Sequence, residues 1–242
     1  MCTVTFIPSG RELFITSNRD EKSLRAPAAL PGKRRLKTGD AIFPADGQAG
    51  GSWIVIHEFG HVLVLLNGYG QKHQPKVHYR KSRGLVLLDL ADAFSPYEHF
   101  SKIDLAGIEP FTVIVWERGS LWECGWDGFK KEKRSLDSLK AQIWSSVTLY
   151  DEATIAMRRQ WFGDWIDQTP SPSHKQILAF HEFSGNGNKD TDLVMHRDNG
   201  YRTVSITSAR IGADSAVLDY LDTVQQQHAR TQISFTKAIV SS

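Results

Sequence analysis

The chain has 242 residues, 40% hydrophobic and 23% charged, which is typical of a globular protein. A net charge of only +2 argues against a dedicated nucleic-acid-binding protein, and the two cysteines, Cys2 and Cys124, exclude a disulfide framework. No signal peptide is evident and no run approaches the roughly 20 apolar residues of a membrane span, so we expect a cytoplasmic protein. The sequence leaves the oligomeric state open.

The first 21 residues predict a β-hairpin. Residues 3–7 and 13–17 are rich in β-branched and aromatic side chains, and Pro8-Ser9-Gly10 separates them. A hairpin returns the end of its second strand to the start of its first. We therefore expect Asn18-Arg19-Asp20 to lie beside Cys2.

Cys2 has unusual chemistry if Met1 is removed, as is normal before a small residue. The residue then carries a thiol, which is a strong nucleophile once deprotonated, and a free α-amine with a pKa of about 7.7–8.0. Nucleophile and base on one residue define an N-terminal-nucleophile (Ntn) enzyme. Asp20 could orient the amine, and Arg19 could hold an anion or lower the pKa of the thiol. The alternative is that Cys2 is only part of a structural strand.

Residues 25–37 are basic and rich in proline. They could gate a pocket at Cys2 or hold an anionic substrate, but an ordinary solvated loop is the favoured interpretation. The segment therefore predicts a loop without regular structure.

A second hairpin is predicted from residues 53–57 and 62–67, whose apolar character indicates strands buried on both faces. The turn contains His57-Glu58-Phe59-Gly60-His61, which matches the zinc-protease pattern H-E-x-x-H. That pattern binds zinc only on a helix, where positions four apart share a face. Flanking β-branched residues and Gly60 favour a hairpin turn instead. Asn67-Gly68 closes the hairpin, either as a simple turn or with the Asn67 side chain emerging into a pocket.

The rest of the chain alternates helical and strand-rich segments. A third hairpin is expected from residues 111–116 and 121–126, with Cys124 as an inert packed thiol. In the predicted helix before Phe183, Ser171 acts as the N-cap and Pro172 occupies the first helical position. Helices are predicted at residues 85–91, 97–103, 151–166 and 172–183, and late strands at residues 193–196, 203–211 and 216–221.

These elements predict an α+β fold with two stacked antiparallel sheets covered by helices. Residues 203–208 alternate strictly between polar and apolar side chains, which indicates a half-buried strand. No linker or repeat divides the chain, so we expect one domain spanning residues 1–242.

Three sequence features together resemble the NRDE-motif family, the transport and Golgi organisation 2 proteins. They are Met1-Cys2, the tetrapeptide Asn18-Arg19-Asp20-Glu21, and Gly50-Gly51-Ser52-Trp53. The resemblance extends along most of the chain and is weaker in the middle. That family is itself similar to Ntn acylases such as penicillin V acylase and bile salt hydrolase. The resemblance therefore implies a four-layer αββα sandwich.

The resemblance also implies roles for individual residues. Asn67 matches the Asn that donates a hydrogen bond to the oxyanion in the acylases, and Arg202 matches an Arg-Thr segment that closes the active site. Asn18 and Asp20 match an Asn-x-Asp triplet. The acylase Arg that precedes this triplet is Ser17 here, so the thiolate-stabilising role does not transfer directly to Arg19. An Asn expected near residue 147 is also missing, and Ser146 or Thr148 would have to replace it.

The leading hypothesis is an Ntn cysteine hydrolase or acyltransferase that acts on a linear amide or acyl bond of a small molecule. Its catalytic residues would be Cys2, Asp20 and Asn67, with no metal and no cofactor. The substrate-binding residues would be Asn18, Arg19 and Arg202. The alternative is a non-catalytic carrier for haem, lipid or acyl-CoA, which are hydrophobic anionic ligands, on the same fold. Roles in haem or lipid handling have been proposed for the family.

Overall fold

The computed structural model describes residues 3–236. Cys2, the expected nucleophile, lies outside the described residues. Thr3 is the first described residue and begins the first strand of the predicted N-terminal hairpin. No helix within residues 3–236 is both long enough and apolar enough to cross a membrane.

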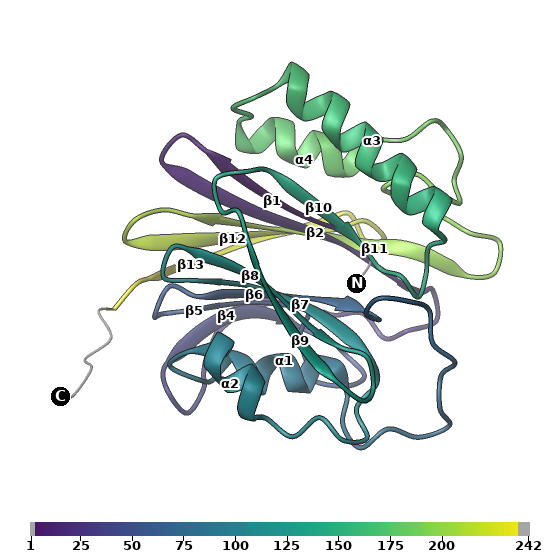
Figure 1. Ribbon diagram of the computed structural model, residues 1–242. Helices are drawn as coiled ribbons and strands as arrows, with labels where there is room; N and C mark the ends of the chain where they lie inside the picture. The colour runs from purple at the N-terminus through teal and green to yellow at the C-terminus, as the bar shows by residue number, and fades with distance from the viewer. Residues whose placement is uncertain (1–2, 237–242) are drawn as a thin grey trace.

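Two antiparallel sheets form the centre of the molecule (Figure 1). The seven strands of sheet B follow chain order, whereas sheet A joins early strands to late ones. Sheet A contains, in spatial order, β10 (Gln142–Ser145), β1 (Thr3–Ser9), β2 (Glu12–Lys22), β11 (Tyr201–Ile211), β12 (Ser215–Asp222) and β13 (Gln227–Ser234). Sheet B contains β3 (Ala29–Arg35), β4 (Asp40–Ala45), β5 (Ile54–His57), β6 (Val62–Asn67), β7 (Phe111–Glu117), β8 (Ser120–Trp126) and β9 (Lys131–Leu136).

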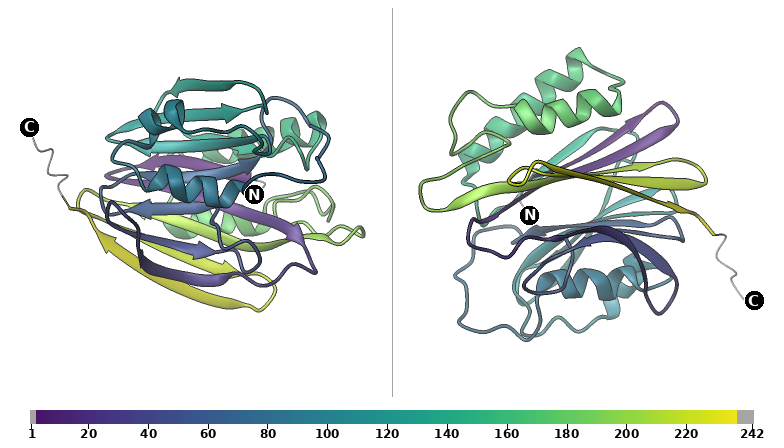
Figure 2. Two further views of the ribbon diagram at one scale, coloured as in Figure 1. Left: turned by 90° about the horizontal axis from the view of Figure 1, so that it is seen from below. Right: turned by 180° about the vertical axis from the view of Figure 1, so that it is seen from behind.

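Helices cover the outer face of each sheet, which gives four layers in the order αββα (Figures 1 and 2). Sheet B carries α1 (Arg83–Ala91) and α2 (Pro96–Lys102), and sheet A carries α3 (Glu152–Gln168) and α4 (His174–Phe183). The four predicted helices are therefore confirmed. The N-cap of α4 is Ser173 rather than the predicted Ser171, because Ser173 and Gln176 form a reciprocal capping box.

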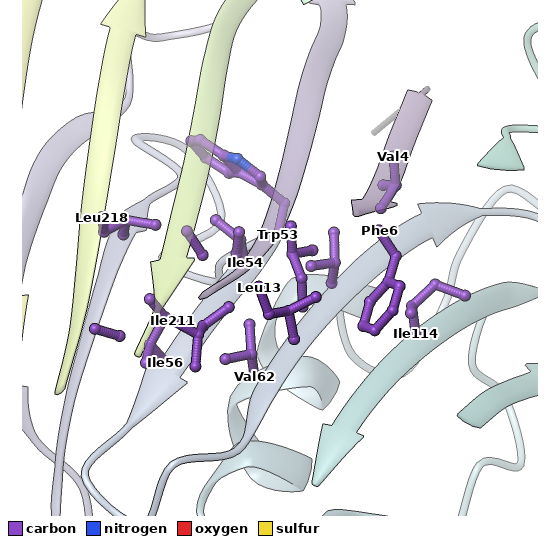
Figure 3. Packing of buried hydrophobic residues seen from close by; sticks show 14 of the residues in the cluster. Val4, Phe6, Leu13, Trp53, Ile54, Ile56, Val62, Ile114, Ile211 and Leu218 are labelled. Atoms are coloured by element: carbon purple, nitrogen blue, oxygen red, sulfur yellow. The ribbon is translucent and has the colours of Figure 1, made fainter. Parts of the chain in front are cut away.

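Alternate side chains of a strand point to opposite faces of its sheet, so one strand contributes both to the core between the sheets and to the core between its sheet and the helices. Leu13 and Ile15 of β2 pack between the sheets, whereas Phe14 packs against α3 and α4. Figure 3 shows the central packing, in which Phe6 of β1 faces Ile114 of β7. Residues 13–20 of β2 are thus covered on both faces, and any polar side chain in this stretch must find a partner inside the protein.

Three expectations for strands differ from the structure. The predicted loop at residues 25–37 contains the edge strand β3, which tolerates its charges because its side chains are largely exposed. Residues 203–208 are mostly buried on both faces rather than half-buried, because α4 covers β11. Residues 193–196 form only an isolated bridge from His196 to Arg202.

Candidate active site

The start of β1 is the point at which the predicted site residues converge. Thr3 lies opposite Asn18 on one side and opposite Ser145 of β10 on the other. The next residue, Ser146, places its Oγ 2.8 Å from the backbone oxygen of Asn67. The NRDE segment therefore lies at the start of β1, as the hairpin argument predicted, and the end of β6 lies there as well.

Arg19 extends from β2 into the space between the sheets. Its guanidinium lies 4.5 Å from the ring centroid of Trp53, and its Nη2 donates a 2.5 Å hydrogen bond to Asp46. The same Asp46 oxygen accepts from Arg25 Nε at 2.8 Å. Burial alone would raise the pKa of Asp46, but hydrogen bonds from Arg25 and Ala49 and the two arginine charges lower it to about 2. Arg19 is thus a fixed cation, 6% exposed.

The Gly-Gly-Ser-Trp segment holds Trp53 beneath Arg19. Gly51 packs so closely on α1 that a Cβ atom there would lie 2.4 Å from the backbone carbon of Gly84. Ser52 N donates to the Gly84 oxygen at 3.1 Å, which ties the loop to the start of the helix. Trp53 Nε1 reaches across to Thr207 Oγ1 of sheet A at 3.3 Å. Gly51 and Gly84 are needed for this close approach of backbones.

A cavity of about 390 Å³ opens beside Arg19 and Trp53. Asn67 lines it from the end of β6, and among the residues that the structure describes no hydrogen bond uses its side-chain amide. A free amide donor in a cavity can bind an oxyanion or another acceptor. The other lining residues that carry charge are Glu21, Arg25, Asp46, Lys81, Arg83 and Glu109.

Asp20 lies on the opposite face of β2, toward the helices that cover sheet A. Its Oδ1 accepts a 2.5 Å hydrogen bond from Thr203 Oγ1, and its Oδ2 accepts one from the Tyr150 hydroxyl. Asn18 lies on the same face and is fully buried. Its Nδ2 donates to the backbone oxygens of His181 and Leu193, at 3.0 and 2.8 Å.

Arg202 comes close to Arg19 from the neighbouring strand. It belongs to β11 and lies opposite Glu21 of β2. Together with Arg19, Glu21 and Arg25 it lines a small hollow of about 70 Å³. Its Nε is buried and has no hydrogen-bond partner among residues 3–236. A buried guanidinium nitrogen without a partner is suited to an anionic group.

The structure also identifies partners that sequence reasoning missed. Asp46 locks Arg19, while Tyr150 and Thr203 hold Asp20. Successive side chains of a strand point to opposite faces, so the sequence could have placed Arg19 on one face of β2 and Asn18 and Asp20 on the other. No local signal in the sequence points to the three partners.

The zinc-protease pattern lies in the turn between β5 and β6, so the predicted hairpin is confirmed. The rings of His57 and His61 stack with centroids 4.7 Å apart, and His61 Nε2 lies 2.9 Å from the Ala91 backbone oxygen. Within the described part of the chain, no group of three or more His, Cys, Asp or Glu side chains is arranged to hold a metal.

Comparisons with known proteins agree with this architecture. A profile of the family described as Transport and Golgi organisation 2 matches residues 1–200. No curated protein matches the chain. Similar solved structures include the N-acylethanolamine-hydrolyzing acid amidase ortholog of Caenorhabditis elegans, with 12% identity and a TM-score of 0.57 over 86% of this chain and 92% of that one.

A variant of conjugated bile acid hydrolase from Clostridium perfringens gives a TM-score of 0.59 at 12% identity, over 100% of this chain and 99% of the other. A mutant of the same hydrolase gives 0.57 at 11% identity, over 98% of each chain. At this identity the likeness shows the fold alone. The predicted four-layer sandwich of the Ntn-hydrolase type is confirmed.

Proposed function

The chain belongs to the Transport and Golgi organisation 2 family, and from this premise we propose that it is an Ntn cysteine hydrolase or acyltransferase acting on a linear amide or acyl bond. One observation carries the proposal. The free side-chain amide of Asn67 and the fixed cation of Arg19 line one cavity beside the start of β1. The amide is suited to stabilise the oxyanion that forms in acyl transfer, and the cation is suited to bind an anionic part of the substrate.

In the proposed reaction, the Cys2 sulfur attacks the substrate carbonyl carbon while the α-amine of Cys2 takes the thiol proton. Asn67 Nδ2 donates a hydrogen bond to the oxyanion of the tetrahedral intermediate. As the intermediate collapses, the carbon–nitrogen bond breaks and the ammonium group returns the proton to the leaving amine. Water, or an acceptor amine or alcohol, then attacks the thioester and releases the Cys2 thiol. Asp20 orients the α-amine throughout.

The remaining predicted residues shape the charge around this chemistry. Arg19 and Arg202 provide positive charge for an anionic part of the substrate, and the buried Nε of Arg202 supports this role. Asn18 supports the site from the face of β2 that is turned away from the cavity, because it donates hydrogen bonds to His181 and Leu193, which cover sheet A. We also propose that residues 1–242 act as one domain, because sheet A joins residues 3–22 to residues 142–234.

The proposal is tested by intact mass and peptide mapping before and after brief iodoacetamide treatment at pH 7. We expect Met1 to be absent and Cys2 to be labelled far ahead of Cys124, because burial raises the pKa of the Cys124 thiol to about 12. Cys2→Ala should abolish the fast labelling, and Cys124→Ala should leave it unchanged. Retained Met1, or a Cys2 that reacts no faster than a free cysteine peptide, contradicts the mechanism.

Asn67 is tested with a panel of N-acyl amides and thioesters. Asn67→Ala should lower turnover by roughly 10²- to 10³-fold and leave the rate of Cys2 alkylation unchanged, because alkylation forms no oxyanion. Asn186→Ala, which removes an exposed amide far along the chain, is the matched control. Equal turnover in the Asn67 and Asn186 variants would remove Asn67 from the mechanism.

The carrier hypothesis draws on the same arginines, because the free Arg202 Nε suits an anionic ligand with or without turnover. If wild-type protein binds haem or acyl-CoA tightly, turns over no acyl substrate and shows slow Cys2 labelling, the carrier is supported and the enzyme is rejected. Loss of that binding in Arg202→Met, with binding retained in Arg210→Met on the same strand, would locate the ligand.

A further inference from the structure

A layer of buried polar side chains lies behind the start of β1 and β2, between sheet A and its helices. At its centre is Arg158 of α3, whose side chain is 0% exposed. Its Nη1 donates to Thr3 Oγ1 at 2.5 Å, and its Nε and Nη2 donate to the backbone oxygens of Thr191 and Asp192, at 3.0 and 2.6 Å. All these acceptors are neutral oxygens.

A buried guanidinium without a bonded carboxylate is expensive, so its remaining contacts must stabilise its charge. The Arg158 guanidinium lies 3.8 Å from the ring centroid of Tyr150. The Tyr150 hydroxyl in turn donates to Asp20 Oδ2. Arg158 is therefore connected to the Asp20 carboxylate through the face and the hydroxyl of one tyrosine.

The second oxygen of Asp20 is held just as firmly. Thr203 Oγ1 accepts a hydrogen bond from the Met195 backbone N–H at 3.0 Å. Its own proton has two acceptors in reach, and Asp20 Oδ1 at 2.5 Å is much closer than the Leu193 backbone oxygen at 3.3 Å. Each carboxylate oxygen thus has its own hydroxyl donor, one from the segment before α3 and one from β11. Two donors on two oxygens fix the orientation of the carboxylate plane.

We propose that Tyr150, with Arg158 stacked on its ring, is a positioning residue that holds Asp20 for proton transfer at the N-terminal amine. The proposal rests on the proposed function. A cation on the face of a phenol draws electron density from the ring, which makes the hydroxyl a stronger donor to a carboxylate. Arg158 also donates a hydrogen bond to Thr3, so a single side chain contacts both Tyr150 and the start of β1.

The charged and titratable groups around Tyr150 and Asp20 support this role. Arg158 faces the tyrosine from α3, and the Arg197 guanidinium lies 5.2 Å from its ring centroid. His181 of α4 is fully buried, and burial together with the charge of Arg158 lowers its pKa to about 3. His181 is therefore neutral, and the two cations Arg158 and Arg197 lie near the ring of the tyrosine that contacts Asp20.

The test is the rate of Cys2 alkylation as a function of pH in Tyr150→Phe, which keeps the ring beneath Arg158 and removes only the hydroxyl. We expect a rate at pH 7 lowered by about tenfold, since hydrogen bonds to charged groups are among the stronger ones. Without the donor, the pair formed by carboxylate and ammonium holds its proton more tightly, so the acid limb of the profile should move to higher pH. Tyr69→Phe, which removes a tyrosine–glutamate hydrogen bond on sheet B, is the matched control.

Thr203 supplies a second pair of variants if Tyr150→Phe does not fold. Thr203→Val should reproduce the slower rate and the shifted limb, and Thr203→Ser, which keeps the hydroxyl, should restore both. An unchanged rate and profile in Tyr150→Phe and Thr203→Val would overturn the proposal, as would a lower melting temperature without a shift of the acid limb. Slow alkylation of Cys2 in the wild-type protein would instead reject the proposed function, and this inference with it.

Discussion

At the scale of single residues, Asp46 is the carboxylate that binds Arg19 and Arg25, two of the cations that line the cavity. It accepts hydrogen bonds from Arg19 and Arg25, and the backbone N–H of Ala49 lies 2.7 Å from its Oδ1. Arg19 is stacked on Trp53 at the same time. The position of the Arg19 charge is thus set by a residue that lies outside every recognised motif of the chain.

Asp46→Asn should destabilise the protein by about 2 kcal/mol at neutral pH. The pKa of Asp46 is lowered to about 2 in the folded protein, from an ordinary value near 3.8. Its contribution is therefore complete above pH 4 and disappears as the pH falls toward 2. Denaturant unfolding at several pH values, with sucrose present to keep the protein folded in acid, measures the difference.

The matched control for Asp46 is Asp198→Asn, which breaks the exposed ion pair with Lys189. It should change the free energy of unfolding by less than about 0.5 kcal/mol. An Asp46 variant as stable as the Asp198 variant at pH 7 would mean that the arginines find other partners.

At this scale, the sequence was sufficient to predict that Asn18, Arg19 and Asp20 gather at the start of β1, because a hairpin requires it. It did not predict that Asn18 and Asp20 face the helices while Arg19 faces sheet B. The partners of Asp20 could not be predicted either, because Tyr150 and Thr203 are 130 and 183 residues away along the chain. Such contacts depend on the packing of whole layers.

At the scale of elements, two backbones meet where the Gly50–Trp53 loop crosses the start of α1. A Cβ atom on Gly51 would lie 2.6 Å from Leu85 N, and one on Gly84 would lie 2.9 Å from the Ser52 oxygen. Both contacts involve backbone atoms, which cannot rotate away as a side chain can. The helix and the loop therefore fix each other, and with them Trp53.

Gly51→Ala should cost about 1–3 kcal/mol, because the loop must move off the helix. It should also slow alkylation of Cys2, since Trp53 and Arg19 move with the loop. Gly163→Ala in α3 is the control, because a Cβ atom there meets no atom within 4 Å. That variant should stabilise the protein by about 0.5–1 kcal/mol. Chemical denaturation of both variants makes the comparison, and a Gly51 variant of wild-type stability would show that the contact can relax.

The start of α4 provides a second test at this scale. Ser173→Ala should cost about 1 kcal/mol, because Ser173 is the N-cap and shares a capping box with Gln176. Ser171→Ala removes the residue that the sequence favoured as the cap, and it should cost less than about 0.5 kcal/mol. Thermal unfolding distinguishes them, and the reverse order of stability would restore Ser171 as the cap.

Many of the elements that the sequence predicted share one property, which is a clear run or period of apolar residues. The hairpins of β1–β2, β5–β6 and β7–β8 and the helix α4 belong to this group. The sequence missed β3, β4, β9 and β10. Of these, the edge strands β3 and β9 carry charges on half and on most of their exposed positions, respectively. Edge strands need little apolar surface because one side has no neighbour, so their pattern resembles a loop.

At the scale of the whole molecule, each interface between a sheet and its helices contains a buried neutral imidazole. His181 lies behind sheet A, and His61 lies behind sheet B with its Nε2 at the Ala91 oxygen. Burial lowers the pKa of both to about 3, aided by the charge of Arg158 on His181 and of His57 on His61. Both outer layers are thus sensitive to acid.

The protein should therefore lose stability as the pH falls below 6.5. The unfolded chain binds a proton on each imidazole near pH 6.5, whereas the folded protein does so only near pH 3. Each imidazole should remove about 2 kcal/mol from the free energy of unfolding by pH 5. His181→Gln and His61→Gln should each reduce the loss between pH 7 and pH 5, as measured by denaturant unfolding.

His228→Gln is the control for the acid effect, because His228 is exposed on β13. It should leave the slope of stability against pH unchanged. A wild-type protein whose stability is flat from pH 7 to pH 5 would contradict the prediction, since it would require both imidazoles to gain their protons inside the fold.

The order of strands in the two sheets has a consequence for synthesis on the ribosome. Sheet B is a meander of neighbours in the chain, so it can form from local contacts as residues 29–136 emerge. Sheet A places β2 between β1 and β11, and Asp20 pairs in register with Thr203. Strand β2 is made early, but we expect it to be completed last. The carboxylate that orients the proposed base is therefore held in place only when β11 docks, so a nascent chain carries its thiol before that base is positioned to activate it.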